Sequence, residues 1–249
     1  MRDPLRPAVA ALSFLTAAPV GRRDPVTEQE LRRGVVFFPV VGALAGALTG
    51  VVAWGAALVL PAPVAAILGV AAGIGATGAL HLDGLADTMD GVGASLAGDE
   101  PAPAMADPRL GTWGGAALVF DLLLKVSVIS SLVATDGFPW EVVAAGTLGR
   151  MSIVALALAV PYAGPEHGAG GWTRGLDRPR CLVALGIGVA ICVVTAGSRS
   201  VAMILAAAAV SVPVAVWSSR HVGGMRGDSF GAAAESSETF ALAASLLSF

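Results

Sequence analysis

The sequence predicts an all-α, polytopic membrane protein: a helical bundle of about six transmembrane helices with one further short helix at the N-terminus. Three observations lead to this fold class. Hydrophobic residues make up 55% of the 249-residue chain, and 32 more residues are glycine. Charged residues make up 13%, against the roughly 25% usual for soluble domains, and the mean hydropathy is +0.77. A soluble domain of this length needs more polar surface than the chain supplies.

Six apolar stretches are long enough, or nearly so, to cross a hydrocarbon core of about 30 Å. None alternates as a barrel strand does, and backbone groups in lipid must be satisfied within the segment, so we expect helices. Pro61 and Pro63 join the first two stretches into a hairpin, and residues 198–200 join the last two. The six stretches are 35–60, 62–80, 115–134, 141–160, 181–197 and 201–217.

The ends of the chain carry two shorter apolar runs. Residues 8–20 follow Arg2 and Arg6, which is also the pattern of a signal peptide, with a candidate cleavage site near Thr16. We interpret this run as a short re-entrant or interfacial helix and keep the signal peptide as the alternative. The run 240–249 is also too short to span. Residues 1–249 are expected to form a single integral-membrane domain.

The arginines indicate the orientation. With the N-terminus inside, only Arg199 falls on the outer side, so the positive-inside rule predicts a cytoplasmic (inner) membrane protein with both termini cytoplasmic. The polar segments 83–114, 162–180 and 218–239 then form loops on the cytoplasmic face, where we expect the active site. The arginines expected inside are Arg2, Arg6, Arg22, Arg23, Arg32, Arg33, Arg109, Arg174, Arg178, Arg180, Arg220 and Arg226.

Charge and cysteine usage exclude several classes of protein. The formal net charge of −3 does not indicate a nucleic-acid partner, and none is expected. Cys181 and Cys192 lie in one apolar run without metal-type spacing, so we interpret them as small apolar residues of the core. The lipid bilayer is the partner that the composition requires, and a homo-oligomer stays open.

Three aspartates recur at helical spacing after the second apolar stretch. If this segment is a helix, Asp83, Asp87 and Asp90 share one face, where like charges repel unless a cation lies between them. Carboxylate oxygens suit Mg²⁺, Mn²⁺ or Ca²⁺, and Mg²⁺ indicates phosphate chemistry. The alternative is a solvated acidic helix end. His81 falls on the opposite face and is expected to contact another segment.

Five motifs occur in the order found in one known family. They are residues 77–91 (TGALHLDGLADTMDG), Phe14-Leu15-Thr16 with Pro19-Val20, Phe38-Pro39-Val40-Val41-Gly42 with Gly46, residues 107–114 (DPRLGTWG), and residues 223–232 (GGMRGDSFGA) with Glu235. Together they resemble the cobalamin synthase family, the adenosylcobinamide-GDP ribazoletransferases. The chain departs from the family pattern at Ala79, where a second glycine is usual, and at Arg226, where a small hydroxyl residue is usual.

This resemblance implies a transferase of cobalamin biosynthesis. Its substrates would be adenosylcobinamide-GDP and α-ribazole or α-ribazole 5′-phosphate, and its products adenosylcobalamin or its 5′-phosphate, and GMP. A ribose hydroxyl attacks the cobinamide-linked phosphorus, and GMP leaves. Such transfers depend on positioning and charge neutralisation. One or two Mg²⁺ ions, with Mn²⁺ as a substitute, are therefore the expected cofactor.

We expect metal ligands in Asp83, Asp87 and Asp90, with Asp107 and Asp228 as additional ligands. Asp107 and Asp228 have alternatives: each could cap a local turn or helix, or bind the guanine or a ribose. The residues expected to take part in catalysis are Asp83, Asp87, Asp90, Arg109 and Lys125. One of the three aspartates would serve as base toward the attacking hydroxyl.

The Gly-rich segment after Arg109 precedes an apolar helix, whose free N–H groups, with the guanidinium, suit a phosphate. A snorkelling interfacial Arg109 is the alternative. Lys125 can pair with Asp121 at i, i+4 or reach substrate phosphate, and Arg150 needs an unidentified partner within the bundle. The expected substrate-binding residues are His81, Arg109, Gly111, Thr112, Gly114, Gly224, Gly227 and Asp228.

Two other functions share parts of this pattern. A CDP-alcohol phosphotransferase shares an Asp-Gly-x-x-Ala motif, but Asp87 stands where that family has Arg, and its downstream aspartates are missing after Asp90. An ion transporter would use the same aspartates, but such sites usually lie near the bilayer midplane, whereas these lie at the membrane edge.

Overall fold

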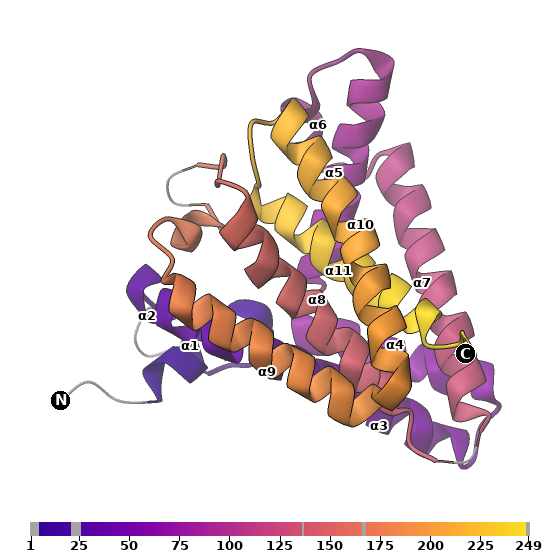
Figure 1. Ribbon diagram of the computed structural model, residues 1–249. Coiled ribbons are helices and arrows are strands. Elements are labelled where there is room, and N and C mark those ends of the chain that lie inside the picture. The colour runs from indigo at the N-terminus through magenta and orange to yellow at the C-terminus, as the bar shows by residue number, and fades with distance from the viewer. Residues whose placement is uncertain (1–4, 21–25, 136, 166–167, 248–249) are drawn as a thin grey trace.

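The computed structural model describes residues 5–20, 26–135, 137–165 and 168–247, and this part of the chain is helical throughout apart from turns and one isolated bridge between Tyr162 and Met225. Arg2, Arg22 and Arg23, which entered the orientation argument, lie outside these residues. The all-α prediction is confirmed (Figure 1). The helices are α1 Arg6–Leu15, α2 Glu28–Gly34, α3 Phe38–Ala57, α4 Ala62–Thr77, α5 Leu80–Ala97, α6 Pro101–Met105, α7 Thr112–Val133, α8 Trp140–Ala159, α9 Arg178–Ala196, α10 Ser200–His221 and α11 Gly227–Ala244.

Each of the six predicted apolar stretches corresponds to a helix, in order α3, α4, α7, α8, α9 and α10. Within the described residues, four segments are long and apolar enough to cross a membrane: Glu28–Ala57, Thr112–Val133, Trp140–Ala159 and Arg178–His221. The last contains both α9 and α10, which diverge from their junction in Figure 1. The 16-residue α4 qualifies only together with α5, across a bend of 90°, which would make a fifth span.

Glycines set the close packing of α3 on α8. A Cβ on Gly42 would lie 2.2 Å from the carbonyl oxygen of Gly146, and one on Gly46 would lie 2.4 Å from that of Val142. Small residues at such crossings let helix backbones approach closely, as is common in membrane bundles. Of this pair, α8 also packs against the polar helix α11.

The polar segments differ from the expectation of loops. Residues 83–114 form most of α5, then α6 and the start of α7, and residues 218–239 form the end of α10 and most of α11. In Figure 1 α11 passes behind α10 through the middle of the bundle. Its face is built from alanine, glycine and serine, and Ala233, Ala234 and Ala241 are fully buried. These small residues let a helix with two glutamates pack at the centre of the bundle.

The short N-terminal helix is confirmed as α1, ten residues long. Its Ala10, Ala11 and Leu15 are buried in the bundle. Phe14 stacks on Phe38 at 5.9 Å between ring centroids, and Trp172 meets both rings edge-on. An aromatic cluster thus joins α1, α3 and the segment after α8.

Candidate active site

A sharp elbow between α4 and α5 positions the aspartates. Gly78 and Ala79 both have left-handed backbone conformations, with φ of 63° and 58°. Two such residues in succession turn the chain by the 90° that separates the helices. The bend brings α5 out of the apolar path of α4. α5 carries three aspartates and is not by itself long and apolar enough to cross a membrane.

The first two aspartates face a groove. Its volume is about 560 Å³, and α5, the segment 106–110 and the first half of α7 enclose it. Asp83 and Asp87 line it from α5, and Asp107 and Arg109 line it from the opposite side. Asp83 is exposed and Asp87 is half-buried. Asp83 and Asp87 share one face of α5, as the spacing predicts. Both lie across the groove from Arg109.

Asp90 has a different role in the structure. Its Oδ2 accepts a hydrogen bond of 2.7 Å from the backbone N–H of Gly111, and its Oδ1 accepts one of 2.8 Å from that of Gly114. A Cβ at either glycine would lie within 2.5 Å of this carboxylate. The N–H groups expected to be free for substrate phosphate are therefore occupied by an anion from the same chain. Thr112 is exposed at this helix start.

Asp107 and Arg109 bind each other. Asp107 accepts a hydrogen bond of 2.9 Å from the backbone N–H of Arg109 and two, of 3.0 and 2.7 Å, from its guanidinium. Hydrogen bonds from the Arg109 side chain and then its backbone hold the pKa of Asp107 at about 2 and raise the pKa of Arg109. The guanidinium is 87% exposed, so the bidentate pair can open toward a phosphate.

Asp228 lies beside α5, in the first turn of α11. A Cβ on Gly84 would lie 2.7 Å from the carbonyl oxygen of Asp228 and 3.0 Å from the Cα of Gly231, so the two helices cross almost in contact. Burial raises the pKa of Asp228. Burial, then repulsion by Asp83, Asp228 and Asp90, raises the pKa of Asp87 to about 6. The four carboxylates are thus close enough to repel one another.

Magnesium is the cofactor that the sequence led us to expect. Among the described residues, no group of three or more Asp, Glu, His or Cys side chains is arranged to hold a metal ion. The donors still suit Mg²⁺, which commonly takes one or two carboxylates and completes its shell with water and substrate phosphates. Asp83 and Asp87 fit that description, because both line the groove and the charge of Asp83 contributes to the raised pKa of Asp87.

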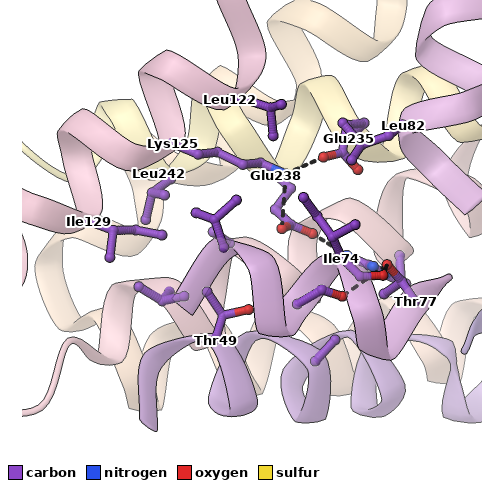
Figure 2. A pocket seen from close by; sticks show the side chains of 16 residues that line it. Thr49, Ile74, Thr77, Leu82, Leu122, Lys125, Ile129, Glu235, Glu238 and Leu242 are labelled. Atoms are coloured by element: carbon purple, nitrogen blue, oxygen red, sulfur yellow. Dashed lines mark hydrogen bonds and ion pairs between the residues drawn. The ribbon is translucent and has the colours of Figure 1, made fainter. Parts of the chain in front are cut away.

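Lys125 lies apart from the groove, in a buried ion-pair network (Figure 2). It donates to Glu235, lies 3.3 Å from Glu238 and is 3.7 Å from Asp121. The predicted pairing with Asp121 is confirmed, but Glu235 is the nearer partner. Three carboxylates account for this buried cation without a substrate, so a catalytic role for Lys125 stays a prediction.

The unidentified partner of Arg150 is Glu238, which accepts from its guanidinium. Arg150 also lies 3.3 Å from Nδ1 of His81, at the start of α5. Burial, and next the charge of Arg150, hold the pKa of His81 well below its usual value, so the imidazole is neutral. The sequence analysis missed Glu238. The available signal was two glutamates, 235 and 238, on one face of an alanine-rich segment in a chain with two intramembrane cations.

Gly224 and Gly227 serve packing. Gly224 has φ of 149°, and a Cβ there would lie 2.4 Å from the carbonyl oxygen of Pro161. The backbone beside it pairs with the segment after α8, since Met225 donates to Pro161 at 2.9 Å. Gly227 lines a second pocket beside Asp228. The structure therefore explains Gly224 by its backbone contacts and leaves a substrate contact at Gly227 as a prediction.

Comparison with known proteins identifies relatives over nearly the whole chain. A family model described as cobalamin-5-phosphate synthase matches residues 7–246. A protein of Klebsiella pneumoniae (strain 342), named adenosylcobinamide-GDP ribazoletransferase, is 39% identical across 95% of this chain and 98% of its own. A protein of Escherichia coli (strain K12) with the same name is 35% identical over the same shares. No solved structure was found to match the chain.

Proposed function

This chain belongs to the cobalamin-5-phosphate synthase family, and we propose that it is a Mg²⁺-dependent adenosylcobinamide-GDP ribazoletransferase. A ribose hydroxyl of α-ribazole, or of its 5′-phosphate, attacks the cobinamide-linked phosphorus of adenosylcobinamide-GDP. A new P–O bond to the ribose forms as the bond to the bridging oxygen breaks. The hydroxyl proton passes to a base, and GMP leaves. The products are adenosylcobalamin, or its 5′-phosphate, and GMP.

The groove beside α5 is the observation that carries the proposal. Asp83 and Asp87 face Asp107 and Arg109 across about 560 Å³, a size that admits a diphosphate and leaves a bulky corrinoid outside. Asp83 and Asp87 would hold Mg²⁺, which would neutralise charge on the diphosphate. Arg109, released from Asp107, would bind a phosphate oxygen through both of its terminal N–H groups.

The proposed base is one of the two groove aspartates. Asp87 is the better candidate, because it lines the groove half-buried, and in the metal-free protein burial and three neighbouring carboxylates raise its pKa to about 6. Asp90 is less suited, because both of its oxygens already accept backbone hydrogen bonds. The groove would open toward the cytoplasm of an inner-membrane protein, an orientation supported by the arginine distribution.

The test is turnover of the detergent-purified protein with adenosylcobinamide-GDP, α-ribazole and Mg²⁺, following both GMP release and cobalamin formation. We expect product only with metal, loss of product on chelation, and at least a 100-fold loss in Asp87→Ala. Asp99→Ala is the matched control, because Asp99 is an exposed aspartate just beyond α5. No product from folded wild-type protein would overturn the assignment, and equal activity of the two variants would overturn the role of Asp87.

A further inference from the structure

A second pocket lies on the other side of Asp83 from the groove. It has a volume of about 70 Å³ and shares Phe14, Ala169 and Trp172 with a neighbouring hollow of about 360 Å³. Asp83 lines both this pocket and the groove, so a molecule bound here would reach the proposed reaction centre. Its walls are mainly apolar and aromatic, formed by Phe14, Leu15, Leu80, Ile153, Trp172 and Phe230.

His81 supplies a donor that no protein group uses. The residue is 3% exposed and lines the pocket. Arginine nitrogens only donate, so Nδ1 of His81 accepts from Arg150 at 3.3 Å, and the ring proton of the neutral imidazole must be on Nε2. No described residue accepts a hydrogen bond from that nitrogen. A buried unpaired donor costs free energy, so a ligand acceptor is its natural partner.

Asp228 supplies the complementary acceptor. Its side chain is half-buried beside Phe230 and lines the same pocket. No described residue donates a hydrogen bond to its carboxylate, although the charge of Arg226 acts on it. The pocket thus combines aromatic walls, one hydrogen-bond donor and one carboxylate. These groups suit a flat base that carries both acceptors and donors on one edge.

We propose that this pocket binds the guanine of the GDP group, and this inference rests on the proposed function. The O6 of guanine would accept from Nε2–H of His81, and its N1–H and N2–H₂ would donate to Asp228. Phe14 and Trp172 would provide apolar wall for the ring. The phosphates would then extend past Asp83 into the groove.

The alternative base, the benzimidazole of α-ribazole, fits the polar groups less well. That ring has one acceptor nitrogen and no N–H, so it could satisfy His81 but not Asp228. A carboxylate covered by the ligand without a donor would weaken binding. Guanine satisfies both groups at once. Its bidentate contact would also select guanine over other purines, because analogues that lack one donor leave the carboxylate partly unpaired.

The test is equilibrium binding of GMP, IMP and XMP to the detergent-purified protein, without any corrinoid. We expect wild type to bind GMP at least tenfold more tightly than IMP, which lacks the 2-amino group, or XMP, which has an oxygen there. Asp228→Asn, nearly the same in shape, should lose the preference over IMP and favour XMP, because its amide N–H₂ can donate to that oxygen. Asp99→Asn, at an exposed position just beyond α5, is the control and should leave the order unchanged.

The outcomes separate the two proposals. If the preference changes in Asp228→Asn but no cobalamin forms in the turnover assay, the pocket assignment holds and the proposed reaction falls. If cobalamin forms but wild type and Asp228→Asn rank the three nucleotides alike, the guanine assignment is overturned. Competitive displacement of GMP by α-ribazole in wild type would also overturn it, because the pocket would then belong to the benzimidazole.

Discussion

Oδ1 of Asp90 lies 2.8 Å from the backbone nitrogen of Gly114, so a side chain of α5 caps the first turn of α7. Gly111 donates to the other oxygen of the same carboxylate at 2.7 Å. The positive end of α7 is thereby neutralised by a residue 24 positions earlier in the chain. Three aspartates that look equivalent in the sequence divide into one structural residue and two that face the groove.

Replacing Asp90 by alanine should therefore destabilise the fold. Two hydrogen bonds to a charged acceptor and a helix cap are lost, which predicts a decrease of about 2 kcal/mol in the free energy of unfolding. Unfolding of the detergent-solubilised protein by SDS titration would measure it. Asp83→Ala is the matched variant, and we expect a change below about 0.5 kcal/mol because Asp83 is exposed. Equal effects of the two variants would contradict the division of roles.

The elbow between α4 and α5 carries strain at Ala79, whose backbone is left-handed. A non-glycine residue at φ of 58° costs roughly 1–2 kcal/mol, partly offset by the greater freedom of glycine in the unfolded chain. Ala79→Gly should thus raise the free energy of unfolding by about 0.5–1 kcal/mol. The control is Ala76→Gly in the last turn of α4, which should lower it by up to about 1 kcal/mol. A loss of stability in Ala79→Gly would contradict the strain at this residue.

Periodicity and composition predicted the features of the fold that depend on residues close together in the sequence. The six apolar stretches became helices, and the spacing of Asp83 and Asp87 placed them on one face of α5. The segment 218–239 was mistaken for a loop, because its polar residues suggested solvent. In the structure its Glu235 and Glu238 bind the buried Lys125 of α7 and Arg150 of α8, contacts that depend on where α7 and α8 lie.

The site could be predicted only where its residues are neighbours in the chain. Arg109 and Asp107 are two positions apart, and both line the groove. Glu238 and Arg150 are 88 positions apart, and nothing in the local sequence couples them. For Asp90 the local sequence showed both the acceptor and the Gly-rich helix start, but not that each would satisfy the other.

Glu238 should be among the residues most important for stability. It accepts from Arg150 and lies 3.3 Å from Lys125, and both cations are buried. Glu238→Ala leaves the buried guanidinium of Arg150 without its carboxylate partner, so we expect a loss of about 3 kcal/mol in the free energy of unfolding. Glu141→Ala removes the more exposed pair with Arg199 and should cost at most about 1 kcal/mol. Similar losses in the two variants, measured by SDS titration, would argue against the network.

The raised pKa of Asp87 predicts how stability and metal binding depend on pH. Burial and then Asp83, Asp228 and Asp90 raise it from 3.8 to about 6, so the metal-free folded protein keeps a proton that the unfolded chain releases. Between those two values the folded state binds more protons, and this group therefore makes the fold less stable as the pH rises. Asp87→Asn should remove that decline in SDS titrations at different pH values, and an unchanged decline would contradict the assignment.

Magnesium should reverse the preference of Asp87 for its proton, because a cation between Asp83 and Asp87 favours both ionised forms. Below about pH 6 binding must displace the proton, so the apparent Mg²⁺ affinity should fall by up to about tenfold per pH unit and level off above it. Calorimetric titration of Mg²⁺ without substrate, from pH 5 to 8, would show this in wild type. Asp87→Asn should bind more weakly and without the step near pH 6. An affinity independent of pH in wild type would mean that Asp87 does not bind the ion.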